Sequence, residues 1–159
     1  MRVLITGSCG FIGSHIADAL LAGGHEVAGL DNLSSGKRSN LDERAKLYVQ
    51  DITRMDHLRM SFMMFKPEAV CHQAAQPSLR ASIEDPAHDA EVNIIGTLNV
   101  LQACKEYGVG HIVFASTAAV YDVTPSTAPA FAEDSPIGPT LPYGIAKTAA
   151  ELYIRNSGL

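Results

Sequence analysis

Two side chains that together could move a proton stand four positions apart near the end of the chain. Tyr143 and Lys147 belong to the segment "PYGIAKTAAEL", whose periodicity predicts a helix, so both side chains share one helix face. A phenol with an ordinary pKa of about 10 is a poor base at neutral pH, but a nearby ammonium group favours the phenolate. Tyr143 is therefore a candidate general base, although the same spacing also occurs in ordinary amphipathic helices.

A glycine-rich segment at the start of the chain predicts a site for a dinucleotide. Gly7, Gly10 and Gly13 stand in "TGSCGFIGSH", between an apolar run and a helical pattern. Glycines at such a turn let the backbone approach a pyrophosphate, and the amide groups of the helix N-terminus would face it. The triplet alone does not decide, because glycines mark any tight strand-to-helix connection.

An acidic residue after the second apolar run strengthens this interpretation and indicates which dinucleotide binds. Asp31 follows Leu30, where a carboxylate can accept hydrogen bonds from the hydroxyl groups of the adenosine ribose. The same carboxylate would repel a 2′-phosphate, which favours NAD over NADP. Lys37 and Arg38 lie nearby and keep NADP as the alternative.

The elements that must position these residues alternate along the chain. Short apolar runs alternate with longer segments of helical period, which is typical of βαβ units and predicts an α/β fold with a doubly wound, mainly parallel sheet of the Rossmann type. The expected strands are 2–6, 26–30, 46–49, 69–72 and 111–115, and the expected helices are 11–22, 55–65, 86–107 and 142–156. The Pro- and Ser-rich stretch 122–141 predicts a loop near a site or a plain surface excursion.

The composition narrows the class of ligand. The 159 residues carry a formal net charge of −5 and scattered basic residues, so no surface for nucleic acid or an anionic membrane is expected. Cys9, Cys71 and Cys104 form no Cys-x-x-Cys pair, which predicts reduced, buried thiols and no metal site. No apolar run is long enough for a signal peptide or a membrane span. We therefore expect a single cytoplasmic domain with a small-molecule ligand.

Several motifs stand in an order that resembles one protein family. They are "TGSCGFIGSH", "LDNLSSG", "QDI", "HQAAQ", "VNIIGTLNVL", "FASTAAVYD" and "YGIAK". Together they extend over nearly the whole chain and resemble the extended short-chain dehydrogenase/reductase family, and within it the nucleotide-sugar epimerases of the UDP-glucose 4-epimerase type. The resemblance implies a nucleotide-sugar substrate and an NAD cofactor that is regenerated in each turnover.

The resemblance also implies a path for NAD along the carboxyl ends of the strands. Backbone groups of the glycine turn contact the pyrophosphate, the residues after the second strand hold the adenosine ribose, and those after the third flank the adenine. Small residues follow the fourth strand, and an asparagine supports the loop that they begin. The implied residues are, in that order, Gly7, Gly10, Phe11, Ile12 and Gly13; Asp31, Asn32, Ser35 and Gly36; Asp51 and Ile52; Ala74 and Ala75; and Asn93, with Tyr143 and Lys147 at the nicotinamide end.

The resemblance completes a catalytic set of Thr117, Tyr143 and Lys147. Thr117 falls at the position whose hydroxyl group bonds the reacting sugar oxygen, while Ala118 and Ala119 stand where dehydrating or decarboxylating relatives carry acidic residues. This pattern favours an epimerase, which would oxidise UDP-glucose or UDP-galactose transiently at C4 and return the hydride to the other face. An NAD(P)-dependent nucleotide-sugar reductase or dehydratase and a non-catalytic dinucleotide-binding module remain alternatives.

Members of this family are longer and commonly form dimers. A smaller C-terminal region normally supplies most contacts to the sugar nucleotide, so this substrate region is expected to be largely absent from residues 1–159. The resemblance implies a homodimer through 86–107 and 142–156, although an internal core would also explain the apolar residues on several faces of 86–107. Asp122 stands where relatives usually have glycine, so the geometry of the substrate loop is not carried over.

Overall fold

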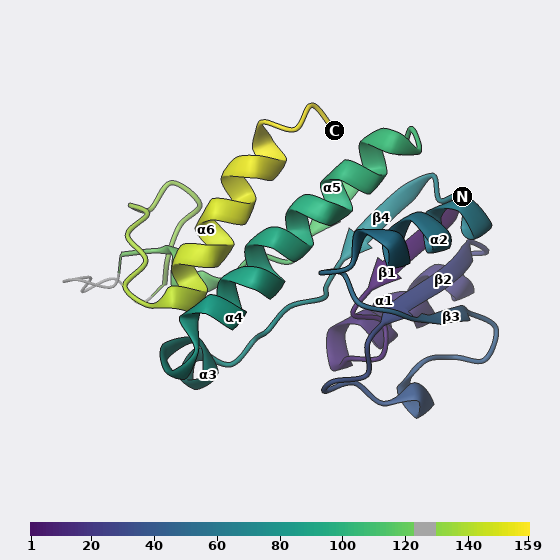
Figure 1. The fold of residues 1–159 in the computed structure, drawn as a ribbon, viewed down its shortest axis with the longest axis horizontal. Coiled ribbons are helices and arrows are strands. Elements are labelled where there is room, and N and C mark those ends of the chain that lie inside the picture. Colours follow the sequence, from purple (N-terminus) through teal and green to yellow (C-terminus); the bar gives the residue numbers. More distant parts are fainter. Residues whose placement is uncertain (123–129) are drawn as a thin grey trace. The chain divides into compact units, whose positions relative to one another are not determined.

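The computed structural model of the chain describes residues 1–122 and 130–159 (Figure 1). The backbone divides into two compact units. The first contains residues 1–75 and 99–115 together with Leu159, and the second contains residues 76–98 and 116–158. The helix α5 (Gly96–Glu106) therefore contributes its first turn to the second unit and its remainder to the first.

The first unit is built on a five-stranded parallel sheet. Its strands are β1 (Arg2–Thr6), β2 (Glu26–Asp31), β3 (Lys46–Val49), β4 (Ala69–His72) and β5 (Ile112–Phe114), in the order β3-β2-β1-β4-β5. In the central strand β1, Ile5 lies opposite Gly29 on one side and Cys71 on the other. The strand order reverses between β1 and β4, and open α/β sheets bind ligands beyond the carboxyl ends of the strands at such a point.

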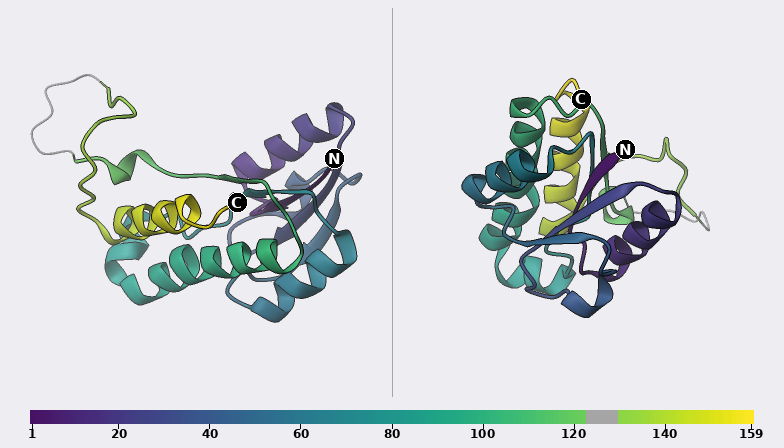
Figure 2. Two further views of the ribbon diagram at one scale, coloured as in Figure 1. Left: turned by 90° about the horizontal axis from the view of Figure 1, so that it is seen from above. Right: turned by 90° about the vertical axis from the view of Figure 1, so that its right-hand side faces the viewer.

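Helices cover both faces of this sheet. Figure 2 (left) shows α1 (Phe11–Ala22) on one face and α2 (Met55–Phe65), with the C-terminal part of α5, on the other. A short 3-10 helix, η1 (Arg38–Asn40), lies between β2 and β3. Burial on both faces explains why β1 and β2 are almost continuously apolar. The core between α1 and the sheet is a cluster of buried residues: Val3, Ile5, Cys9, Ala17, Val27, Leu41, Ala45 and Cys71.

The second unit is helical. It contains α3 (Leu79–Glu84), α4 (Pro86–Ala90), the π-helical segment η2 (Glu91–Ile95), the first turn of α5, the 3-10 helix η3 (Ala118–Val120) and α6 (Pro142–Arg155). Helix α6 packs against α3, α4, η2 and η3. Tyr121, just after η3, pairs with Ile137 in an isolated bridge and stacks on Phe131, with ring centroids 5.0 Å apart.

The alternation of strands and helices and the Rossmann-type fold agree with the sequence prediction, and the differences are local. The second strand continues through Asp31, the fifth spans only Ile112–Phe114, and α6 ends at Arg155. The expected helix 86–107 contains the π-helical segment η2, in which the side chain of Asn93 hydrogen-bonds to Gln76 and Asp89. Part of the expected loop, 123–129, lies outside the described residues.

Helix α3 was not expected from the sequence. Its N-cap, Ser78, accepts a hydrogen bond from the amide of Ala81 over 3.1 Å, which is a recognisable start signal. The helix has only one turn and a half before Asp85 and Pro86 end it and begin the next helix. Such a short segment shows too little periodicity to be identified from its apolar pattern.

Candidate functional site

The glycine turn brings three backbone segments of the first unit together. Gly7 has φ +68°, and its amide donates to the carbonyl of Leu30 over 2.8 Å. A Cβ atom on Gly7 would lie 2.6 Å from the amide nitrogen of Ala74, and one on Gly13 would overlap the carbonyl oxygen of Gly7. The turn therefore tolerates no side chain at either position, and it keeps β1, α1 and the residues after β4 in close contact.

The N-terminus of α1 carries the features that a phosphate group requires. Its N-cap is Gly10, which provides no side-chain cap, and Phe11 and Ile12 are exposed. The first amide groups of a helix have no acceptor within the helix and lie at the positive end of its dipole. With the close backbone approach at Gly7 and Gly13, these residues fit the pyrophosphate of a dinucleotide.

Asp31 has a structural contact that the sequence did not indicate. One oxygen of its carboxylate accepts from the amide of Cys9 and the other from the amide of Leu33, each over 2.8 Å. The side chain is 8% exposed and thus links the glycine turn to the loop after β2. Each carboxylate oxygen can accept more than one hydrogen bond, so the ribose hydroxyl groups remain possible donors to it.

The loop after β2 is held against the glycine turn by a residue that sequence reasoning missed. The side-chain amide of Asn40 donates to the carbonyl of Cys9 over 2.9 Å, and the amide of Lys37 donates to the same oxygen over 3.1 Å. A Cβ atom on Gly36 would lie 2.7 Å from the carbonyl carbon of Cys9. Ser35, beside Gly36, is exposed. The loop is thus packed on the turn through its backbone, which requires glycine at position 36.

The structure brings Asn32 and Asp51 together. The amide group of Asn32 donates to Asp51 Oδ2 over 2.9 Å, and Asp51 Oδ1 accepts from the amide and the hydroxyl group of Thr53. Burial would raise the pKa of Asp51, but these hydrogen bonds outweigh it and lower the pKa below its ordinary value. Ile52 is buried, and Asn99 donates to its carbonyl over 3.0 Å, which is a second contact that the sequence did not indicate.

The residues after β4 are fixed by a threonine of β1. The amide of Ala74 donates to Thr6 Oγ1 over 3.2 Å, and this oxygen is also hydrogen-bonded to His72 Nδ1 over 2.6 Å. Ala74 and Ala75 are half-buried. The backbone of Ala74 also lies directly against the glycine turn at Gly7.

In the second unit, Asn93 lies at the centre of a polar network. It is 2% exposed, its Oδ1 accepts from the amide of Gln76 over 3.0 Å, and its Nδ2 donates to the carbonyl of the same residue over 3.1 Å. The same nitrogen donates to Asp89 Oδ1 over 2.9 Å. Asn93 is therefore hydrogen-bonded to both backbone groups of Gln76, which follows β4 in the chain.

The three candidate catalytic residues all lie in the second unit. Thr117 is the N-cap of η3, where its hydroxyl oxygen accepts from the amide of Ala119 over 3.2 Å. A hydrogen bond also joins Thr117 to Tyr143 in the first turn of α6. A Cβ atom on Gly144 would overlap the carbonyl oxygen of Ala119, so glycine allows the close approach of α6 to η3. Lys147, one turn after Tyr143, is 2% exposed.

Burial opposes the charged forms of both members of the Tyr143 and Lys147 pair. It raises the pKa of Tyr143, and the hydrogen bond with Thr117 only partly offsets this effect. It lowers the pKa of Lys147 from 10.5 to about 8, although Asp89 and Glu151 act in the opposite direction. The polypeptide alone thus does not favour the phenolate, and a further positive charge is needed to do so.

The depressed pKa of Lys147 predicts a change of stability with pH. Between the folded pKa of about 8 and the ordinary value of 10.5, the unfolded chain binds the proton and the folded chain does not. The contribution of Lys147 to the free energy of unfolding is therefore lowest below pH 8 and rises by about 3 kcal/mol through this window. Urea unfolding of the wild type and Lys147→Met should differ by a pH-dependent amount of that size. A difference that stays constant across the window would contradict this prediction.

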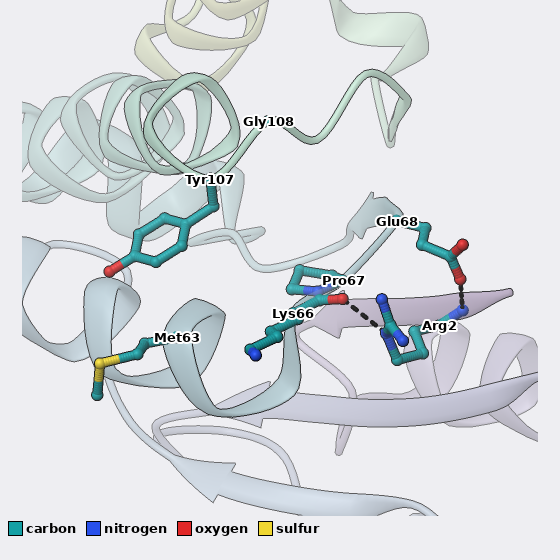
Figure 3. Close-up of a pocket in the computed structure, with 7 residues that line it drawn as sticks. All are labelled: Arg2, Met63, Lys66, Pro67, Glu68, Tyr107 and Gly108. Atoms are coloured by element: carbon teal, nitrogen blue, oxygen red, sulfur yellow. Dashed lines mark hydrogen bonds between the residues drawn. The ribbon is translucent and has the colours of Figure 1, made fainter.

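The first unit also has a cavity that is lined by none of the candidate site residues. It has a volume of about 490 Å³ and lies at the amino ends of the strands (Figure 3). Arg2 donates from its backbone amide to Glu68 and from its side chain to the carbonyl of Lys66 there. The residues that line it are Arg2, Met63, Lys66, Pro67, Glu68, Tyr107 and Gly108. The sequence did not predict a functional role for any of them. Arg2 and Glu68 hydrogen-bond to neighbouring backbone groups, and the side chain of Lys66 is exposed.

Three further features of the described chain concern metals, membranes and cysteines. Within residues 1–122 and 130–159, no group of His, Cys, Asp and Glu side chains is arranged to hold a metal ion. No helix in this part of the chain combines the length and apolar character required to cross a bilayer. All three cysteines are buried and unpaired.

Known proteins similar to this chain include several named UDP-glucose 4-epimerase and one named UDP-glucuronate 4-epimerase. Residues 3–158 match the family described as "NAD dependent epimerase/dehydratase family". The UDP-glucose 4-epimerase of Mycolicibacterium smegmatis is 42% identical over 159 residues, which cover 97% of this chain and 50% of that protein. This chain therefore spans about half the length of that relative.

Two solved structures of UDP-glucose 4-epimerases have the same fold as this chain. The UDP-glucose 4-epimerase of Thermus thermophilus in complex with NAD superimposes with a TM-score of 0.95 and 47% identity, over 99% of this chain and 51% of that one. The Thermotoga maritima UDP-glucose 4-epimerase with UDP-glucose gives a TM-score of 0.94 and 41% identity, over 100% and 53% of the two chains. This chain is a member of the NAD-dependent epimerase/dehydratase family, within the extended short-chain dehydrogenases/reductases.

Proposed function

We propose that this chain forms the NAD-binding and catalytic half of a nucleotide-sugar 4-epimerase whose substrates are UDP-glucose and UDP-galactose. The observation that carries the proposal is the joint placement of Thr117, Tyr143 and Lys147, with the tyrosine hydrogen-bonded to the threonine and the lysine one turn further along α6. A module that only stored a dinucleotide would have no use for this combination. The UDP-glucose 4-epimerases among the relatives and solved structures support the same activity.

The residues of the first unit would hold NAD. Amide groups at the start of α1 would bind its pyrophosphate, Asp31 and Asn32 its adenosine ribose, and Asp51 its adenine amino group. Ser35, Gly36, Ile52, Ala74 and Ala75 line the same proposed path, and Asn93 supports it. When bound, NAD⁺ supplies a reversible acceptor for the hydride at C4 of the sugar and a positive charge that favours the phenolate of Tyr143.

Tyr143 would act as the general base on the 4-hydroxyl group, directly or through Thr117. As the C4–H and O–H bonds break, the phenolate takes the proton and a 4-keto sugar forms; the reverse transfer to the other face of the sugar completes the epimerisation. Lys147 would hold the nicotinamide ribose. Ala118 and Ala119 contribute no acid or base after Thr117, which supports epimerisation over dehydration.

Asp31 predicts a preference for NAD over NADP. A 2′-phosphate would meet a carboxylate, while the side chain of Arg38 is engaged with the carbonyl of Leu41 over 3.0 Å. We expect NAD⁺ to bind about tenfold or more tightly than NADP⁺, because like charges at short distance are costly. Isothermal titration of the chain with each dinucleotide measures the ratio. Lys37→Ala serves as the control and should leave this ratio unchanged. Equal affinities for NAD⁺ and NADP⁺ would contradict the prediction.

Incubation with UDP-galactose and NAD⁺ tests the activity of the natural protein that contains these residues. Formation of UDP-glucose without net NADH is the expected result. Net consumption of the cofactor would indicate a reductase instead. Tight binding of NAD⁺ with no change in any nucleotide sugar would indicate a non-catalytic module.

We further propose how the chain is organised and where it acts. Residues 1–159 would form one NAD-binding domain, with most contacts to the sugar nucleotide supplied from outside them, since the relatives are about twice as long. A homodimer through 86–107 and 142–156 is supported by exposed apolar side chains at Ile95, Ile145 and Leu152. A cytoplasmic location is supported by the unpaired thiols.

A further inference from the structure

Asp89 on α4 is a buried carboxylate that the proposed mechanism does not use. It is 1% exposed, and its Oδ1 accepts from Gln76 Nε2 and from Asn93 Nδ2, each over 2.9 Å. Both donors are neutral amides. Burying an ionised carboxylate is costly unless a positive charge also lies close to it. The question is therefore which cation accompanies Asp89.

The buried ammonium group of Lys147 meets this requirement. Helix α4, which carries Asp89, packs against α6, which carries Lys147 (Figure 1). Both side chains are almost fully buried. Burial raises the pKa of Asp89 and lowers that of Lys147, and the charge of each group acts on the pKa of the other in the opposite direction. Each buried charge thus stabilises the other.

Other charged groups around α6 are engaged elsewhere. Glu151, one turn after Lys147, accepts a hydrogen bond from the hydroxyl group of Ser116 and has the smaller effect of the two acids on the pKa of Lys147. On α3, Arg80 pairs with Glu84 over 2.7 Å, and His88 of α4 lies 3.7 Å from Glu91 of η2, all on exposed side chains. Asp85 caps α4, and Tyr143 is the remaining titratable neighbour on α6 itself.

We propose that Asp89 is a positioning residue for the catalytic set. Its carboxylate holds Asn93 and Gln76 through hydrogen bonds and supplies a buried negative charge for the ammonium group of Lys147. The proposal rests on the proposed function, because the charge matters to the reaction only if Lys147 holds the nicotinamide ribose. Asp89 would then have two effects. The amide network places the loop after β4, and the charge keeps Lys147 protonated despite its burial.

Titration of Lys147 by NMR tests the electrostatic part without NAD or substrate. The lysine side chains are labelled with ¹³C at Cε, and the Lys147 signal is identified by its loss in Lys147→Arg. In the wild type the midpoint should lie near pH 8. In Asp89→Asn, which keeps the shape of the side chain and removes its charge, the midpoint should move to lower pH. Asp89→Glu should restore most of the shift.

Glu151→Gln is the matched control, since it removes the other carboxylate that raises the pKa of Lys147, one turn further along α6. Its midpoint should move less than that of Asp89→Asn. An unchanged midpoint in Asp89→Asn, or a larger shift in Glu151→Gln, would overturn the proposal. Asp89→Glu keeps the negative charge but changes the shape of the side chain. Recovery of the Lys147 midpoint in this variant therefore indicates an electrostatic effect of Asp89, and no recovery indicates a structural one.

The wild type provides a second measurement that does not depend on a variant folding. The ¹³Cγ shift of Asp89 should report an ionised carboxylate at neutral pH, and a protonated Asp89 would overturn the proposal. Both titrations are made without cofactor. A failure there would leave the proposed epimerase activity intact, whereas a failure to convert UDP-galactose would leave the coupling between Asp89 and Lys147 standing.

Discussion

Tyr143→Phe is expected to lower kcat of the natural protein by about 10²–10⁴-fold, because the variant loses its general base. The ring stays in the first turn of α6 and keeps its half-buried packing, so the free energy of unfolding should change little. The affinity for NAD⁺ should also remain close to that of the wild type. Steady-state kinetics with UDP-galactose and calorimetric titration with NAD⁺ measure the two quantities separately.

Tyr121→Phe is the matched control for the loss of a phenolic hydroxyl group. Tyr121 stacks on Phe131 through its ring, and this contact does not require the hydroxyl group. Its kcat should stay within about twofold of the wild type. If Tyr143→Phe were as active as Tyr121→Phe, Tyr143 would have no part in the reaction.

The second large effect is expected at Gly7. Gly7→Ala combines a left-handed backbone, φ +68°, with a Cβ atom 2.6 Å from the amide nitrogen of Ala74 and 2.8 Å from its Cα. Neither neighbouring atom belongs to a flexible side chain, so β1 and the residues after β4 would have to separate. We expect the free energy of unfolding to fall by about 3 kcal/mol or more.

Gly24→Ala separates the two causes of this loss. Gly24 has a similar φ, +76°, but a Cβ atom there would meet nothing within 4 Å. Gly24→Ala should therefore lower the free energy of unfolding only through the strain of the left-handed backbone, by about 1 kcal/mol. Urea unfolding of both variants gives the comparison. Equal losses would show that the close approach at Ala74 contributes nothing.

The fold was largely predictable because its signals are local. The runs 2–6, 46–49 and 69–72 are short and largely apolar, which is typical of strands in a parallel sheet, and their expected bounds agree with the structure. Asp31 was identified as a ligand of the ribose but belongs to β2 itself. Its hydrogen bonds to Cys9 and Leu33 depend on a turn formed elsewhere in the chain.

The parts of the site that were not predicted depend on long-range contacts. Asn40 and Asn99 hold backbone carbonyls of distant loops, and neither stands in a spacing that suggests this. Asp89 precedes Asn93 by one helical turn, and this spacing could have indicated a polar pair on a shared face. Its burial and its relation to Lys147 arise only from the packing of α4 on α6.

The most direct test of transient oxidation at C4 follows an isotope. The natural protein containing these residues is incubated with UDP-galactose deuterated at C4 and an amount of NAD⁺ equal to the enzyme. The account predicts UDP-glucose that retains deuterium at C4, with no accumulation of reduced cofactor. UDP-glucose that has lost the deuterium to solvent, or deuterated NADH formed in proportion to the sugar consumed, would contradict it.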